Sequence, residues 1–556
     1  MKCCQTRRLL SPILVAVFAF AGIIQPAAAQ DAGPAAGVST KPVVVLTLGS
    51  FNKLMRDVNY ITAAVGQPGA GGLFAMYAGS MANGLDMDRP IGVLVPLVDG
   101  MPQPLALLPT DNVKKMLSRM EAQLGPADEL SDGTLVIAIN MQTVYIKQAG
   151  DWAVVSNNRD ALKLAPADPD ATFKDIGEKY FLYVRLRLQE IPADMRSMMI
   201  GQMRQGFEQA MAQNPDGAQA REMAEGSLDQ FEQLINESDE LNFALDVNQS
   251  SRFIQLLTSF KAVPGSELSR LYKDVESAPS KFASVIRPDA AMYLHASQNI
   301  PPAMVEATRE SVGNTMQMFE GMLESAEDLS ETQREDINEM LGRIIKLSMK
   351  SMEEGRSDAG ALLLAGEDQG RFVFGSRVAD GNEAASIVKD FADKIKDETD
   401  APEFFFDVET YNGVTLHRVE AEVPADKDEA RQIFGDKLEV HIGTGPKSMY
   451  AAIGKNSLAL MKELIDAPEE SAAPAGRPTT QMIVKMQPML EFADNIEASP
   501  PVTAMLSALE KADEPGMLRM VVEPIPNGNV TKITVSEGML KALGAAAAAG
   551  QNGNEF

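Results

Sequence analysis

The chain has 556 residues, and its 77 acidic side chains outnumber 50 lysines and arginines, giving a formal net charge of −27 at pH 7. An acidic excess of this size opposes attraction to phosphate backbones and anionic headgroups, so we expect no nucleic-acid partner. The length exceeds what a single hydrophobic core usually organises, so more than one domain is expected.

The first 29 residues have the layout of a secretory signal peptide. Lys2, Arg7 and Arg8 precede a short apolar run, and three alanines at 27–29 form a cleavage site. The run is shorter than a membrane-spanning helix and ends at that site. We therefore predict a signal peptide over 1–29, a linker over 30–41, and a periplasmic or extracellular bacterial location.

Both cysteines, Cys3 and Cys4, lie within the predicted signal peptide. The processed chain would then contain no cysteine and form no disulfide. No transmembrane segment is expected after cleavage. A chain of this size can be stabilised by its core alone.

Four stretches further along the chain predict a strand that runs directly into a helix. Each has a β-branched or apolar run followed by apolar residues at helical spacing. The strand and helix of each pair cover 43–48 and 51–65, 180–188 and 193–211, 291–296 and 302–323, and 481–486 and 489–493.

Each of these units is followed by a predicted hairpin and a further helix. Turn sequences such as Asp99-Gly100 and Asn527-Gly528 supply the positive φ angles of tight turns. The hairpin strands cover 91–97 and 104–108, 241–247 and 251–257, 361–364 and 371–376, and 517–522 and 530–535. The helices that follow cover 111–124, 266–275, 384–395 and 537–543.

A second landmark, a strand followed by a polar turn and a helix start, occurs at 151–162 and again at 448–460. The order of elements in 42–280 is therefore repeated in 290–543. We predict an α+β protein with two tandem-duplicated domains over 42–284 and 285–543. Each would be a mainly antiparallel sheet with helices on one face. A flexible tail is predicted over 544–556, and 66–72 is also expected to be loose because of its glycines.

Two long helical hairpins, over 193–238 and 302–354, are predicted as inserts in this repeat. Methionine is abundant, with 32 residues. In the first insert, side chains at three- and four-residue spacing predict one apolar face, a candidate contact surface because methionine adapts to varied partners. That candidate face consists of Met195, Met198, Met199, Met203, Phe207 and Met211. Ordinary helix packing is the alternative interpretation.

The sequence offers no catalytic, cofactor-binding or metal-binding motif. Its three histidines, His295, His417 and His441, lie in predicted strands without the spacing of a metal or catalytic site. Ser50 follows Gly49 before a helix, where an N-cap is the better interpretation than a nucleophile. The glycines in 443–448 indicate a hairpin turn, since they lack phosphate-loop spacing. We expect no enzyme activity and no cofactor.

The recurring strand–helix–hairpin layout, with its landmarks at 151–162 and 448–460, resembles that of uncharacterised exported bacterial proteins built from domains of unknown function. The resemblance covers most of the chain after the signal peptide. It implies no activity and assigns no site residues.

These observations favour an exported, non-catalytic binding or scaffold protein of the bacterial envelope, with the methionine-rich helical faces as contact surfaces for an unknown protein. One alternative is a periplasmic carrier of an apolar ligand such as lipid. Another is a hydrolase with a site assembled from scattered acids and a histidine.

Overall fold

The computed structural model describes residues 41–139, 142–212, 218–325, 331–366, 370–396, 401–425, 428–512 and 514–552. The predicted signal peptide and nearly all of the linker lie outside these ranges. Two compact units are present: residues 41–208 with 238–260 form unit 1, and residues 209–237 with 261–552 form unit 2. Helices and antiparallel strands build both units, which confirms the α+β class.

Unit 1 contains ten strands that pair in one antiparallel order. From one edge to the other, this order is β6, β7, β8, β9, β5, β2, β1, β10, β11 and β12. The strand bounds are β1 Val44–Leu48, β2 Ile91–Val95, β5 Leu105–Pro109, β6 Asp128–Glu129, β7 Leu135–Ile139, β8 Gln142–Ala149, β9 Trp152–Ser156, β10 Leu182–Arg187, β11 Ser238–Asn248 and β12 Phe253–Ala262. A small hairpin, β3 Leu97–Val98 and β4 Met101–Pro102, joins β2 to β5.

Unit 2 contains ten strands in the order β16, β17, β18, β19, β15, β14, β13, β20, β21 and β22. All of these pairings are antiparallel. The bounds are β13 Met292–Asn299, β14 Arg356–Ala365, β15 Gly370–Arg377, β16 Glu403–Tyr411, β17 Val414–Glu422, β18 Lys437–Gly445, β19 Ser448–Ile453, β20 Thr480–Lys485, β21 Met517–Ile525 and β22 Gly528–Ser536.

Helices connect many of these strands. In chain order, they are α2 Phe51–Ala64, α3 Pro68–Met81, α4 Val113–Leu124, α5 Asp170–Lys179, α6 Ala193–Ala212, α7 Ala218–Glu237, α8 Glu267–Tyr272, α9 Pro302–Ser325, α10 Glu331–Glu353, α11 Gly381–Ile395, α12 Asp428–Phe434, α13 Ser457–Asp466, α14 Met486–Ile496, α15 Pro500–Ala512 and α16 Glu537–Asn552. Short 3-10 turns, η2 Asp160–Leu164, η3 Leu188–Glu190 and η4 Ala283–Val285, lie among them.

Strand order is the same in the two halves of the chain, and most helices have corresponding places; α12, between β17 and β18, has no counterpart among the described residues between β7 and β8. Strand β1 corresponds to β13, β10 to β20, and the hairpin β11–β12 to β21–β22. By the same order, the helix pair α9–α10 occupies the place of α2–α3, and α6–α7 that of α14–α15. The helical hairpins predicted as inserts are therefore lengthened forms of regular elements. A common origin by duplication stays a prediction.

The core of unit 2 rests on one face of its sheet. Phe282 is 1 % exposed and lies over two glycines that face each other across β14 and β15, Gly360 and Gly375. A Cβ added at Gly375 would lie 2.5 Å from the Phe282 ring, so only glycine leaves room for that ring here. Tyr450 packs edge-on against Phe282, with ring centroids 5.8 Å apart. Side chains of α13, including Met461, complete this core.

Two segments predicted to be loose are helical. Helix α3 begins at Pro68, where proline suits the first helical turn, and Gly71 lets α3 approach Asn59 and Thr62 of α2 closely. Helix α16 runs through much of the predicted flexible tail to Asn552. The reason is its run of alanines, the residues with the highest helix propensity. Residues 553–556 lie outside the described part of the chain.

Candidate functional site

On the face of the unit 2 sheet opposite the Phe282 core, two rows of apolar side chains cross seven strands. Directly opposed residues of antiparallel strands point to the same face. Leu294 of β13 is paired with Ala361 of β14 on one side and with Met482 of β20 on the other. The pairings continue from Ala361 to Phe374, and from Met482 to Met520.

Two rows of side chains cross the sheet in this way, and we call them the apolar sheet face. It consists of Met292, Leu294, Ala361, Leu363, Phe372, Phe374, Ala451, Ile453, Met482, Val484, Leu518, Met520, Ile533 and Val535. None of these positions is charged or polar. Ala361 is buried and Leu294 is 37 % exposed, while the other twelve are partly exposed. None of the twelve belongs to a buried core of the described residues.

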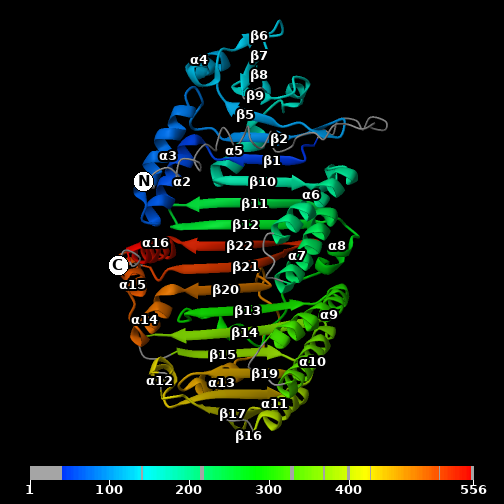
Figure 1. Cartoon of the computed structure of the whole chain (residues 1–556), viewed down its shortest axis with the longest axis vertical. Coiled ribbons are helices and arrows are strands. Elements are labelled where there is room, and N and C mark those ends of the chain that lie inside the picture. The colour runs from blue at the N-terminus through cyan, green and yellow to red at the C-terminus, as the bar shows by residue number, and fades with distance from the viewer. Residues whose placement is uncertain are drawn as a thin grey trace. The chain divides into compact units, whose positions relative to one another are not determined.

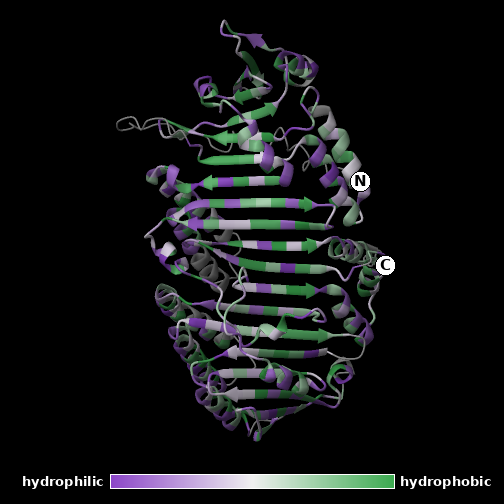
Figure 2. Cartoon of the chain, turned by 180° about the vertical axis from the view of Figure 1, so that it is seen from behind, coloured by the Kyte–Doolittle hydropathy of each residue, from purple (hydrophilic) through white to green (hydrophobic). Residues whose placement is uncertain are grey.

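Helices of unit 2 border this face at the ends of its strands, where Figure 1 shows α9 and α10 on one side and α14 to α16 on the other. Phe492 of α14 contacts the Cβ position of Gly370 on β15. At the opposite end, Met449 packs with Leu347 of α10 and Ile387 of α11. Hydrophobic residues recur along the strands in Figure 2. The centre of the face thus stays partly open between bordering helices.

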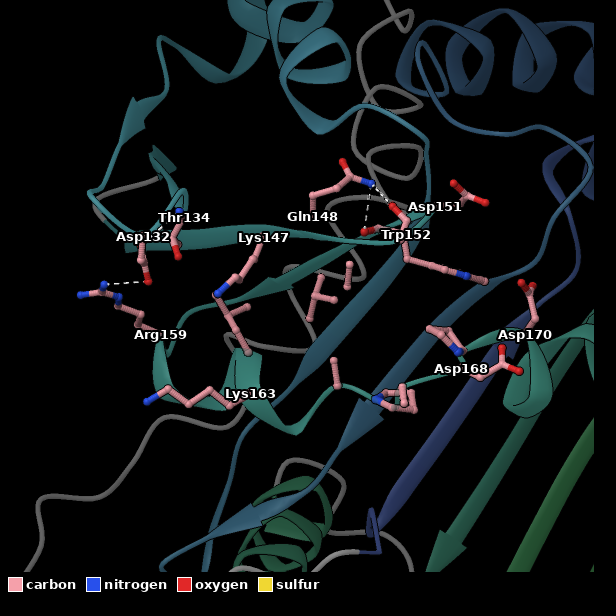
Figure 3. A pocket seen from close by; sticks show the side chains of 18 of the residues that line it. Asp132, Thr134, Lys147, Gln148, Asp151, Trp152, Arg159, Lys163, Asp168 and Asp170 are labelled. Carbon is pink, nitrogen blue, oxygen red and sulfur yellow. Dashed lines mark hydrogen bonds and ion pairs between the residues drawn. The ribbon is translucent and has the colours of Figure 1, made fainter.

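A second candidate site is a cavity of about 810 Å³ in unit 1, lined by β8, β9 and the segment leading into α5. Figure 3 shows Lys147, Arg159 and Lys163 toward one side of it, and Asp151 and Asp168 toward the other. Its wall is therefore polar and carries both signs of charge.

Most of the basic groups in that wall already have acidic partners. Arg159 pairs with Asp132 at 2.9 Å, and this hydrogen bond pushes the pKa of the Asp132 carboxyl well below its ordinary value. Lys163 pairs with Asp160 at 2.7 Å. Arg89 pairs with Asp170 and lies 4.6 Å from the ring centroid of Trp152. With its cations so neutralised, the cavity favours no single class of charged ligand.

Trp152, the only tryptophan of the chain, lines the same cavity and is 2 % exposed. Its indole Nε1 has no hydrogen-bond acceptor among the described residues. Because that atom is itself covered by protein, it is not available to a molecule in the cavity. The indole acts as an apolar wall, packed against Phe173 with ring centroids 6.1 Å apart.

The third candidate is a buried polar cluster around His295 of β13. Ser280 Oγ donates to Asp358 Oδ1 at 2.6 Å and lies 3.0 Å from His295 Nε2. Serine thus stands between the histidine and the carboxylate, whereas a hydrolytic triad needs the histidine between them. His295 Nδ1 has no partner among the described residues, and both His295 and Ser280 are 0 % exposed. These contacts connect β13, β14 and the segment before η4.

We expect acid to destabilise unit 2 through His295. Burial lowers the pKa of His295 from 6.5 to about 4, with a smaller effect from Arg477. Between these values the unfolded chain binds a proton that the folded chain does not, so stability is present above pH 6.5 and falls as the pH drops toward 4. From pH 7 to pH 5, the loss should be roughly 2 kcal/mol at 1.36 kcal/mol per pKa unit.

Urea unfolding at pH 7 and pH 5, followed by circular dichroism, measures this loss. His295→Gln keeps a donor for Ser280 but removes the titration, and should make the pH dependence smaller by about that amount. Burial also lowers the pKa values of His417 and His441, so these two maintain a residual slope in the variant. An unchanged slope in His295→Gln would show that His295 is not the titrating group.

The other two histidines, as predicted, also lie in strands. His417 Nδ1 accepts a hydrogen bond from Asp407 N at 3.1 Å, and His417 Nε2 lies 3.3 Å from Thr444 Oγ1. His441 lies 3.8 Å from Glu439. None of the three histidines lines the four cavities with the best-defined walls in the described part of the chain, all of which lie in unit 1.

The predicted methionine face of α6 is not uniform. Met195 packs on the core beside Leu188 and Ile191, and Met203 and Phe207 are partly exposed. Met198 and Met199 are 48 % and 42 % exposed. The side chain of Met211 lies outside what the structure describes. The predicted set is therefore divided between a core contact and an exposed pair.

Within the described part of the chain, no group of His, Cys, Asp or Glu side chains is arranged to hold a metal ion. Nor does any described helix have the length and apolar character needed to cross a membrane. Sequence reasoning missed the apolar sheet face, although alternate residues of β21 and β22 already show it. Comparisons of the chain with protein-family models, curated proteins and solved structures return no match.

Proposed function

We propose that this protein is an exported, non-catalytic binding protein that holds an apolar ligand on the apolar sheet face of unit 2. The observation that carries the proposal is the face itself: two rows of uncharged apolar side chains across seven neighbouring strands, all of them at least partly exposed except Ala361. A soluble protein normally covers so large an apolar surface, because contact with water is unfavourable. Export is proposed from the sequence of residues 1–29.

The composition of the face favours a hydrocarbon ligand over a protein partner. Binding energy in protein interfaces concentrates in tryptophan, tyrosine and arginine, within a polar rim. The apolar sheet face has none of these three residues and offers only Phe, Leu, Ile, Val, Met and Ala. Its methionines, Met292, Met482 and Met520, adapt their shape to flexible chains.

Sheet geometry and net charge restrict the class of ligand further. Backbone groups in the centre of a paired sheet are already hydrogen-bonded to neighbouring strands, so they are not free to bind a polar group. Six strand spacings of about 4.8 Å give the face a width of about 29 Å. That width accommodates an extended acyl chain, since two such chains make up a bilayer core of about 30 Å. The acidic surface of the protein favours a neutral lipid over an anionic one.

Titration with Nile red and displacement by monoolein, a neutral monoacylglycerol, test the proposal. Leu294→Glu puts a carboxylate in the middle of the face at a position that tolerates it, being 37 % exposed. We expect affinity for both molecules to fall at least ~10-fold, because the ligand would have to desolvate a charge. Matching thermal unfolding of the variant and the parent would show that the fold is kept.

Met198→Glu is the matched control because Met198 is similarly exposed, at 48 %, but lies on α6. Binding should be unchanged in this variant. The reverse result, a loss with Met198→Glu and none with Leu294→Glu, would reject the sheet face. It would favour the second candidate, a scaffold with its contact surface on the exposed pair Met198 and Met199.

The non-catalytic part of the proposal rests on the histidines. Each histidine is buried in a strand. The Ser280 hydroxyl is also buried, and it contacts both His295 and Asp358, so a substrate cannot reach it. A hydrolase of this chain would have to cleave the ester of monoolein or a similar substrate. Release of free fatty acid that is abolished by Ser280→Ala in a folded variant would reverse this part of the proposal.

A further inference from the structure

Unit 1 carries an apolar sheet surface at the place that corresponds to the face in unit 2. The equivalent of the β13–β20–β21 pairing is β1–β10–β11. Leu46 of β1 is paired with Val184 of β10, which is paired with Phe243 of β11. Leu48, Leu182 and Leu245 form the next row in the same way. All of these side chains share one face of the sheet.

Much of the surrounding sheet in unit 1 is covered, which leaves a small open surface. Helix α4 buries the neighbouring part of the face, with Met116 and Leu117 packed on Ala106 and Leu108 of β5. At the end of β10 and β11 where Leu186 pairs with Leu241, Met195 of α6 packs beside these two residues.

Five residues are left between these two covered regions, and we call them the unit 1 patch. They are Leu46, Leu182, Val184, Phe243 and Leu245. Phe243 is 38 % exposed and the other four are partly exposed. None of the five belongs to a buried core of the described residues.

We propose that the unit 1 patch is a second binding site for a neutral acyl chain, so that each protein chain holds two apolar ligands. This inference rests on the proposed function of the unit 2 face. Like that face, the patch contains only apolar side chains, without charge or hydroxyl, and both β1 and β10 are hydrogen-bonded to a strand on each side. Two strand spacings of about 4.8 Å give the patch a width of about 10 Å, which covers part of a single acyl chain.

The unit 1 patch should bind its ligand with lower affinity than the unit 2 face. The patch spans three strands and the face spans seven, so the patch buries less apolar surface and holds its ligand more weakly. Titration should therefore fill the unit 2 face first and the patch second.

Native mass spectrometry of the full processed protein with increasing monoolein counts the bound molecules. The parent protein should reach two per chain. Phe243→Glu should reach one, Leu294→Glu should reach one, and the double variant should bind none. Met101→Glu, at a similarly exposed position of unit 1 (41 %), should keep two. Trp152 fluorescence reports whether unit 1 is folded, and Phe243→Asn replaces the glutamate variant if that variant unfolds.

A parent that binds one molecule, with no effect of either Phe243 variant, would overturn the second site and leave the proposed function standing. A parent that binds none would reject both. Two molecules bound by the folded Phe243→Glu and Phe243→Asn variants would place the second ligand elsewhere, and would also overturn the inference.

Discussion

Replacing Phe282 by alanine is expected to lower the free energy of unfolding of unit 2 by about 3–5 kcal/mol. The ring is 1 % exposed and fills a recess whose floor is the glycine pair Gly360 and Gly375. Because those positions have no side chains that can move into the space, the cavity left behind should collapse little. The edge-on contact with Tyr450, at 5.8 Å between centroids, is also lost.

Urea unfolding followed by circular dichroism measures this effect. Phe231 of α7, which is 48 % exposed, provides the control: Phe231→Ala should change stability by about 0.5 kcal/mol or less. Fluorescence of Trp152 follows unit 1 in the same samples. A loss below about 1 kcal/mol for Phe282→Ala would mean that the recess closes after all.

Substitution of Gly381 by alanine should destabilise unit 2 by about 3 kcal/mol or more, at the upper end of the range for overpacking. Gly381 is the first residue of α11, and a Cβ there would overlap the backbone carbonyl oxygen of Gly445 at the β18–β19 turn. Neither side can easily move away. Gly381 N donates to Pro446 O at 3.2 Å, and Val378 N donates to Lys447 O at 3.1 Å.

Gly313→Ala in α9 is the matched control, since no atom of the described residues outside its own helical turn lies within 4 Å of its Cβ position. That substitution should stabilise the protein by roughly 0.5–1 kcal/mol, because alanine loses less backbone entropy than glycine on folding. Thermal unfolding of both variants and the parent shows directly whether each substitution lowers or raises stability. Equal midpoints for Gly381→Ala and the parent would show that α11 shifts without cost.

Much of the fold was predictable because it depends on local patterns. Alternation of apolar residues located β11 and β12 on each side of the turn at 248–252, and helical spacing located α6 and α9. The glycines at 443–448 indicate a hairpin turn, and the structure confirms it by pairing Gly445 with Ser448. The strand and helix of the second landmark correspond to β19 and α13.

The candidate site was not predictable in the same way, because it is formed by register between distant strands. Leu294 and Met482 meet only through the pairing of β13 with β20, which no local pattern specifies. The sequence also does not show which methionines are buried. The spacing of Met195 and Met198 placed both on one helix face, but only the packed structure separates the buried side chain from the exposed one.

The pairing of β13 with β20 also determines when the sheet can form. His295 and Gln481 are direct neighbours in the sheet although the chain between them includes α9 through α13. Such long-range closure slows folding, since loop entropy is lost before the contact is gained. As a chain emerges amino-terminus first, β13 must wait with an unpaired edge until β20 arrives. During that interval its exposed edge is open to pairing with other chains. Refolding yield should therefore fall steeply with protein concentration, and a holding chaperone should restore it.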